Sequence, residues 1–326
     1  MARQLDLFAA PLPLARGVGA AAVPQDLLAL AAALPQRTRL GTSSWSFPGW
    51  SGIVYDRAAT PTTLARDGLA AYGRHPILRA VGVDRTFYAP LPAETFAAYA
   101  VAVPDDFRFV VKAPELCTLA AFPRHERYGA QRGARNGAFL DAGYAADAVC
   151  APMALGLGAK AGVLVFQFPP QPAALLGGTE RFAARLHDFL VRLPRGLQYA
   201  VELRTQALLT LDYGDALAAA RAAHVVNVHP SMPPPPVQAG LLDQPNAPAL
   251  VVRWMLGHGQ RYETARERYR PFDRLVDEDP ASRREIAQLC RAAAARGRDT
   301  YVIINNKAEG SAPLSAIKLA REIAAG

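Results

Sequence analysis

The sequence contains few cysteines and no long apolar run. The three cysteines, Cys117, Cys150 and Cys290, lie far apart and form no CxxC pair, which argues against a disulfide framework and against a cysteine-based zinc or redox site. No stretch of about 20 uninterrupted apolar residues occurs, and the N-terminus lacks the apolar core of a signal peptide. These absences predict a cytoplasmic protein with no membrane span.

The chain also lacks the composition of a disordered protein. Of its 326 residues, 51% are hydrophobic and 20% are charged, and 36 Lys and Arg against 28 Asp and Glu leave a formal net charge of +8. Such a chain has enough apolar surface to build a large core. Its length fits either two domains or one α/β barrel.

From Thr38 onward, short β-branched runs alternate with longer alanine-rich segments, which indicates repeated βα units. We expect strands in eight runs, at 38–45, 79–88, 108–113, 161–169, 198–204, 224–229, 249–255 and 300–306. Helices are expected between them, at 61–72, 93–103, 138–156, 180–193, 215–223, 280–295 and 314–324. Eight strands with intervening helices favour an α/β fold of the TIM (β/α)8 barrel type over an open doubly wound sheet.

The domain organisation predicted from these patterns is one barrel with a tail. Residues 1–23, rich in Pro and Gly, are expected to be a flexible N-terminal tail, and residues 24–326 to form the TIM barrel as a single domain. A helix over 25–34 would dock at the N-terminal end of the barrel. After the sixth strand, the four prolines at 233–236 predict a stiff polyproline stretch in an exposed loop.

Polar residues that close the strand runs are the candidates for a site, because chemistry in TIM barrels occurs where the strands end. Charges in apolar strands are costly unless they are paired or used. Glu202 with Arg204, and Lys112 with Arg253, are therefore the first candidates for a network at the mouth. The alternative is that such groups only form ion pairs that seal the barrel. The candidates are Ser43, Trp45, Asp84, Thr86, Tyr88, Lys112, Gln167, Glu202, Arg204, His229, Arg253, Asn305, Asn306 and Lys307.

Several sequence blocks resemble a known family. GTSSWSFPGW, VGVDRTFYAP, RFVVKAP, LVFQFPP, VELR and YVIINNKAEGSAPLSAI, in this order, are similar to the signature blocks of the YecE-like family, also called domain of unknown function 72. The resemblance spans residues 40–317 and implies a TIM barrel and a site location, but no reaction. It implies a pocket lined by Ser43, Trp45, Thr86, Tyr88, Lys112, Gln167, Glu202, Arg204, Asn305 and Asn306.

Two positions depart from the family pattern. The family typically reads Val-Glu-Val-Asn-Ser-Thr-Phe-Tyr where this chain has residues 81–88, so Gly82 replaces a Glu. Asn227 stands where an Asp is common at the end of the sixth strand. If the family's chemistry depends on those carboxylates, it is altered or absent here.

The last strand leads into NNKAEGSAP, a turn suited to starting a helix. Gly310 permits a tight turn, Ser311 can cap, and Pro313 fits the first helical turn. TIM barrels often bind phosphate at this place through free backbone N–H groups and the helix dipole. We therefore expect a phosphate site at Lys307, Gly310 and Ser311, with plain helix capping as the alternative.

Two loops add positive charge on the same face. The loop after the third strand carries Arg124, Arg127, Arg132 and Arg135, and the loop after the seventh carries Arg261 and Arg266, both interleaved with tyrosines. Arginines beside aromatic rings can contact phosphates and stack on bases, which predicts nucleic-acid binding. The alternative is an ordinary solvated surface.

Metal and cofactor motifs are scarce. Of the six histidines only His229 closes a strand, so too few ligands are available for a multinuclear zinc site. We predict no cofactor, with a single divalent metal at Glu202 and His229 as the alternative. The sequence contains no P-loop, nucleophile elbow or dinucleotide glycine motif.

The N-terminal tail contains a short motif of its own. Gln4, Leu5, Asp6, Leu7 and Phe8 resemble the peptide with which bacterial polymerases and repair proteins bind the sliding clamp. Gln4 would be the polar anchor, and Leu5, Leu7 and Phe8 the apolar part that fills a preformed pocket. The alternatives are a hydrophobic latch on the barrel or a chance match.

Together these features predict a protein that acts on nucleic acid or another phosphate-bearing substrate at the C-terminal face of the barrel. Its most specific form is a DNA-repair phosphodiesterase or endonuclease recruited to the clamp, by analogy with other barrels. Glu202 would be general base or metal ligand, Lys112, Arg204 and Arg253 would stabilise phosphate charge, and Tyr88 and Trp45 would position the substrate. The alternatives are a small-molecule hydrolase or isomerase acting on a sugar or phosphorylated metabolite, and a non-catalytic DNA-binding accessory. No oligomeric state is indicated.

Overall fold

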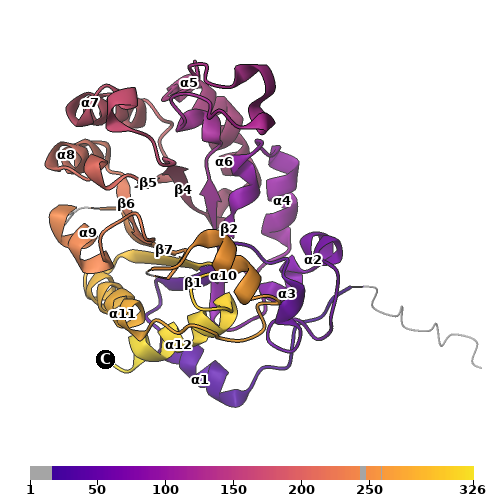
Figure 1. Ribbon diagram of the computed structural model, residues 1–326. Helices are drawn as coiled ribbons and strands as arrows, with labels where there is room; N and C mark the ends of the chain where they lie inside the picture. Colours follow the sequence, from indigo (N-terminus) through magenta and orange to yellow (C-terminus); the bar gives the residue numbers. More distant parts are fainter. Residues whose placement is uncertain (1–16, 243–246, 258) are drawn as a thin grey trace, which may run out of the picture.

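The computed structural model describes residues 17–242, 247–257 and 259–326, and within them parallel strands form a closed barrel (Figure 1). The strands follow one another around the barrel in chain order, and the first pairs with the last, from Thr38 opposite Thr300 to Thr42 opposite Ile304. The predicted TIM (β/α)8 barrel is confirmed. The strands are β1 Thr38–Thr42, β2 Leu78–Val83, β3 Arg108–Lys112, β4 Ala161–Gln167, β5 Gln198–Glu202, β6 Ala223–Val228, β7 Ala249–Trp254 and β8 Asp299–Ile304.

Helices surround the barrel and bury its outer face. In α7, buried Phe182, Leu186, Phe189 and Leu190 recur at the spacing of one helical face, as an amphipathic helix on a sheet requires. The helices are α1 Gln25–Ala33, α2 Pro61–Asp67, α3 Leu69–Tyr72, α4 Ala93–Val101, α5 Ala142–Ala145, α6 Ala151–Leu157, α7 Thr179–Val191, α8 Leu211–Ala220, α9 Pro235–Leu242, α10 Tyr262–Arg268, α11 Pro280–Ala295 and α12 Ala312–Ala324.

The strands contribute to two separate cores, because successive strand side chains point to opposite faces. In β8, Tyr301 and Ile303 belong to the cluster inside the barrel, whereas Val302 and Ile304 pack with the helices outside. Most other members of the inner cluster are alanine and valine. The interior of the barrel is thus a filled core, so a ligand cannot enter between the strands.

Several predicted segments differ from the structure. The strand expected over 79–88 ends at Val83 and continues as a 3-10 helix, Asp84–Phe87, and the helix expected over 61–72 is divided at Gly68. The single helix expected over 138–156 begins only at Ala142, where Asp141 caps it, and a π-helical turn at Ala146–Cys150 divides it. Instead of beginning at 215, α8 starts at Leu211, where the side chain of Thr210 caps the backbone N–H of Tyr213. The predicted polyproline stretch is wrong at its second half: α9 begins at Pro235, since the first helical turn needs no proline N–H.

The chain before the first strand is partly tied to the barrel. The backbone N–H of Gly19 donates to Asp56 at 3.0 Å, and that of Ala21 donates to the Val54 carbonyl at 3.0 Å. Helix α1 packs beside α12. The predicted clamp peptide at residues 4–8 lies outside the described residues. None of the helices in the described part of the chain combines the length and apolar character needed to cross a membrane.

Candidate functional site

A cavity of about 300 Å3 opens where the strands end, and most of the predicted strand-end residues line it. Pockets for small ligands start at about this size. We call it the mouth cavity. The predicted residues in its lining are Asp84, Tyr88, Lys112, Gln167, Arg204, His229, Arg253, Asn305 and Lys307.

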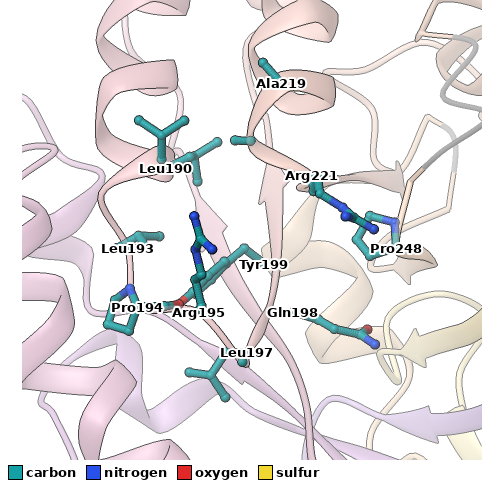
Figure 2. A pocket seen from close by; sticks show the side chains of 13 residues that line it. Leu190, Leu193, Pro194, Arg195, Leu197, Gln198, Tyr199, Ala219, Arg221 and Pro248 are labelled. Atoms are coloured by element: carbon teal, nitrogen blue, oxygen red, sulfur yellow. The ribbon is translucent and has the colours of Figure 1, made fainter.

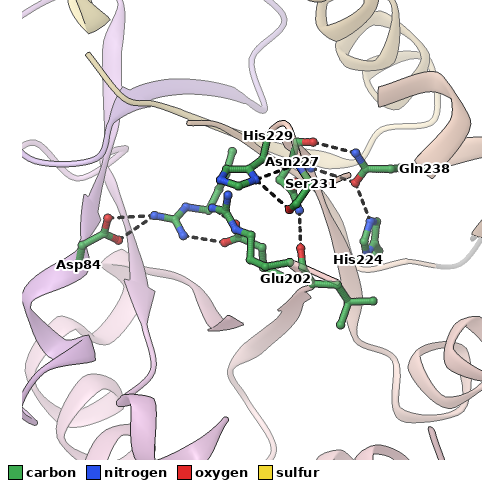
Figure 3. Close-up of polar contacts among 10 residues, drawn as sticks. Asp84, Glu202, His224, Asn227, His229, Ser231 and Gln238 are labelled. Atoms are coloured by element: carbon green, nitrogen blue, oxygen red, sulfur yellow. Dashed lines mark hydrogen bonds and ion pairs between the residues drawn. The ribbon is translucent and has the colours of Figure 1, made fainter. Parts of the chain in front are cut away.

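Beneath the mouth cavity, Glu202 holds two arginines. Its Oε2 lies 2.6 Å from Nη1 of Arg253, its Oε1 pairs with Arg204, and its side chain is fully buried. The other nitrogen of Arg253, Nη2, binds both oxygens of Asp84 at 2.9 and 3.0 Å (Figure 3). The predicted pair of Glu202 and Arg204 is therefore present. Arg253 pairs with Glu202 and Asp84, and Lys112 lines the same cavity as Arg253.

This network sets the charge of Glu202. Burial alone would raise the pKa of its carboxyl, but Arg204 and Arg253 outweigh burial and lower the pKa to about 2. The pKa of Arg253 is raised, because Asp84 and Glu202 outweigh its own burial. Glu202 and Arg253 are thus both charged at neutral pH. Because both oxygens of Glu202 are engaged by arginines, it positions guanidinium groups and is a very weak base.

Two lysines in the cavity have aromatic neighbours and, within the described residues, no carboxylate partner. Nζ of Lys112 lies 3.5 Å from the ring centroid of Phe87, and Nζ of Lys307 lies 4.2 Å from that of Tyr262. Burial lowers the pKa of each lysine to about 8. Both remain largely protonated at pH 7. Desolvated cations without a counter-ion are the feature an anion-binding site requires.

His229 faces the cavity in its neutral form. Burial and the nearby Arg204 lower its pKa to about 4. Its Nδ1 accepts the backbone N–H of Ser231 at 3.2 Å, so the ring proton lies on Nε2 and is available as a donor. The lining thus carries the cations Lys112, Arg204, Arg253 and Lys307 and the anion Asp84. Counting Glu202, which lies beneath the lining and pairs with both arginines, these groups have an excess of two positive charges.

A buried hydrogen-bond network fixes the end of β6 (Figure 3). The amide of Gln238 in α9 accepts from the backbone N–H of Asn227 at 3.1 Å and donates to its carbonyl at 2.7 Å. His224 links Gln238 to the hydroxyl of Tyr213, and burial lowers its pKa to about 4. Nδ2 of Asn227 donates to the Leu203 carbonyl at 2.9 Å. An ionised Asp at 227 could not make that donation.

The second departure, Gly82, has a steric reason. A Cβ at this position would lie 3.1 Å from Cα of Ser43 and 3.3 Å from Cγ2 of Ile303. The family's usual Glu could not enter this space unless its neighbours moved. The carboxylates near the mouth come from Asp84 and Glu202 instead.

Some predicted site residues lie outside the cavity lining. Thr86 is fully buried and donates to backbone carbonyls of Val83 and Lys112, while Asn306 accepts from Trp50 Nε1 and from the Ala312 N–H. Ser43 accepts from Asn305 at 2.8 Å. Trp45 donates to the Ala65 carbonyl. These four residues support the strand ends.

The turn predicted to bind phosphate is buried under other residues. Gly310, at φ +121°, and Ser311 are buried, and a Cβ on Gly310 would lie 2.5 Å from the Arg274 carbonyl. The first free N–H of α12, at Ala312, is capped by Asn306. Glu309 was not among the predicted site residues. It is fully buried and pairs with Arg283, and this pair helps to hold the segment around Arg274 that covers the turn. Of the three residues predicted to bind phosphate, only Lys307 lines the mouth cavity.

The six predicted nucleic-acid-binding arginines are exposed. Arg127 pairs with Glu115 at 2.5 Å, and its Cζ lies 5.8 Å from the ring centroid of Tyr88, which itself lines the cavity. Arg266 pairs with Glu263 at 3.8 Å. Arg124, Arg132, Arg135 and Arg261 form no ion pair with the described residues. They remain available to an external anion.

Residues missing from the prediction include Tyr262 at the start of α10, Pro170, Met255 and Leu256. The position of Tyr262 in an arginine-rich loop after β7 was a usable signal, but the apolar residues offered none. Among the described residues, no group of three or more His, Cys, Asp or Glu side chains is arranged to hold a metal ion. Glu202 is occupied by its arginines, so the described geometry offers little to a metal at Glu202 and His229.

Comparisons with known proteins agree with the fold. The family model described as "Protein of unknown function DUF72" matches residues 39–326. The search of curated proteins found no match. A crystal structure of a DUF72 family protein from Enterococcus faecalis V583 is similar with a TM-score of 0.58 and 18% identity, over 88% of this chain and 95% of that one. One from Thermotoga maritima MSB8 gives a TM-score of 0.53 and 21% identity, over 87% and 98%.

Proposed function

The chain belongs to the DUF72 family, and on that premise we propose that its barrel mouth binds a phosphate-bearing ligand. The observation that carries this proposal is the charge of the mouth cavity. Lys112 and Lys307 are partly buried in it, without carboxylate partners among the described residues, beside the two arginines held by Glu202. The oxygens of a phosphate could accept from the two lysines, and the arginines add positive charge beside them.

The rim supports a ligand that also carries a planar or apolar group. Tyr88 and Tyr262 line the cavity, and their side chains are 71% and 55% exposed. Exposed rings beside cations suit stacking against a nucleobase or packing against a sugar ring. The proposed ligand is therefore a nucleic-acid segment or a small phosphorylated compound.

Exposed arginines favour the nucleic-acid version. Arg127 contacts Tyr88 at the rim, and Arg124, Arg132, Arg135, Arg261 and Arg266 extend the positive surface on loops that follow β3 and β7. The volume of the cavity, about 300 Å3, instead favours a small molecule such as a sugar phosphate. A non-catalytic accessory that only binds DNA would use the same contacts.

Hydrolysis of a phosphodiester is the enzymatic form of the proposal. Lys112, Arg204 and Arg253 would stabilise the charge that develops on phosphate oxygens. With a pKa of about 2, Glu202 is poorly suited to take a proton from water. Lys112, whose pKa is about 8, is the group that exchanges a proton near neutral pH.

The test is binding of a fluorescein-labelled single-stranded oligonucleotide, followed by anisotropy across a salt series, and of glucose 6-phosphate, followed by calorimetry. For three phosphate contacts, log K should fall against log salt with a slope of about −2. Lys112→Gln and Lys307→Gln should weaken whichever ligand binds. Lys318→Gln is the matched control, because Lys318 pairs with Glu278 on the outer surface. The proposal would be refuted if the affinity changed neither with the salt concentration nor in Lys112→Gln and Lys307→Gln.

An incision assay separates the enzymatic version from the accessory version. Abasic and undamaged duplexes are incubated with the full chain, with and without chelator. Incision that is lost in Lys112→Gln supports hydrolysis. Binding without incision supports the accessory.

A further inference from the structure

A second cavity lies between the C-terminal ends of α7 and α8 (Figure 2). Its volume is about 570 Å3, well within the range of small-molecule sites. It is lined by Gln198 at the start of β5, whereas Glu202 closes the same strand below the mouth cavity. The two cavities are therefore at opposite ends of the barrel. We call this one the lower cavity.

The wall of the lower cavity is largely apolar. Leu190 comes from the end of α7, Leu193 from the turn that follows it and Tyr199 from β5, and all three are buried. Ala219 and Ala220 come from the end of α8. The hydroxyl of Tyr199 donates to the Pro194 carbonyl. The tyrosine therefore presents its ring, and not a free polar group, to the cavity. An aliphatic or aromatic body would gain by burial against this wall.

Two arginines lie beside this apolar wall. Figure 2 shows Arg195 rising among Leu193, Tyr199 and Leu190, and Arg221 extending toward Pro248. Both line the lower cavity, and neither forms an ion pair with any carboxylate of the described residues. Guanidinium groups bind carboxylates and related anions through parallel hydrogen bonds.

The backbone at Arg221 gives a separate reason to suspect a role. Arg221 ends α8 with φ 54° and ψ 39°, in the left-handed region. Glycine is the usual residue at such a helix end, and a side chain with a Cβ is strained there. The chain thus keeps a long cationic side chain at a position where glycine would be more stable.

We propose that the lower cavity binds a small amphiphilic acid, with an apolar body and one anionic head group. The body lies against Leu190, Leu193 and the Tyr199 ring. The head group is held by Arg195 and Arg221. This site is separate from the mouth cavity and does not depend on the function proposed for it.

The test uses 8-anilinonaphthalene-1-sulfonate, an amphiphilic sulfonate that fluoresces when it enters an apolar site, and its displacement by decanoate. Arg195→Gln and Arg221→Gln should each weaken binding of the dye by about tenfold, the loss of one charge-assisted contact. Arg192→Gln is the matched control, because Arg192 is an exposed arginine at the same helix end and does not line the lower cavity. It should bind like the unchanged protein.

A further variant separates loss of the site from loss of the fold. Arg221→Gly relieves the left-handed strain, so it should raise the Tm while it weakens dye binding. Equal dye affinity in the unchanged protein, Arg195→Gln, Arg221→Gln and Arg221→Gly would overturn the proposal. So would a failure of decanoate to displace the dye.

Discussion

Arg253 and Glu202 form a buried ion pair below the barrel mouth, with Nη1 and Oε2 2.6 Å apart and side chains 3% and 0% exposed. The pair holds a guanidinium group whose second nitrogen binds Asp84 at the rim of the cavity. Because Arg204 takes the other oxygen of Glu202, one buried carboxylate organises two cations. The structure thus gives Glu202 a positioning role.

The first prediction concerns Glu202→Gln. The substitution keeps the size of the side chain but leaves two buried guanidinium groups without their counter-charge. Removing one partner of a buried pair costs about 3–5 kcal/mol, so the free energy of unfolding in urea should fall by this amount. Glu263→Gln, which removes an exposed pair with Arg266, should change it by less than about 1 kcal/mol. Equal effects of the two variants would contradict the assigned role.

The second prediction is the acid dependence of stability. The pKa of Glu202 is lowered from 4.5 to about 2, so its contribution is complete above pH 4.5 and is lost as the pH falls through 2. A shift of this size corresponds to roughly 3 kcal/mol. Urea unfolding measured from pH 6 to pH 2 should show a smaller loss in Glu202→Gln than in the unchanged protein. Parallel curves for the two proteins would rule out this source of acid sensitivity.

A third prediction links anion binding to pH. Lys112 and Lys307 have pKa values lowered to about 8 by burial, and only the protonated forms attract phosphate. Affinity for sulfate, an oxyanion whose own charge is constant over this range, should therefore be highest below pH 7 and fall as the pH rises through 8. In the double variant Lys112→Gln and Lys307→Gln, the affinity measured by calorimetry should be low and nearly constant from pH 6 to 9. An unchanged fall in the double variant would assign the titration to other groups.

The clamp peptide provides a fourth prediction, independent of the barrel. Leu7→Ala with Phe8→Ala in the full chain should abolish capture by an immobilised bacterial sliding clamp, because the two apolar anchors supply most of the binding energy in such peptides. Gln4→Ala should weaken capture less. Capture that persists in the double variant would exclude this peptide as the contact.

The positions of the strand ends could be predicted from the sequence, and with them most of the mouth cavity. The hydrophobic periodicity and the composition of the sequence locate the β-branched runs that form strands. A parallel barrel brings the carboxyl ends of these strands together. Asp84, Lys112, Arg204 and Arg253 were therefore expected at one place, and they lie there.

The direction of individual side chains could not be predicted. Asn305 and Asn306 are adjacent, yet Asn305 lines the cavity while Asn306 points to Trp50 and the start of α12. The turn that separates them depends on tertiary contacts. Arg221 shows the same limit, because its left-handed backbone and its place in the lower cavity depend on the packing of α7 and α8.

The most direct test of the central claim is a crystal structure of the full chain grown or soaked with tungstate, a heavy analogue of phosphate located by its anomalous signal. The account predicts a peak in the mouth cavity within hydrogen-bonding distance of Lys112 and Lys307. Tungstate found only elsewhere on the surface, with the mouth cavity empty, would contradict it.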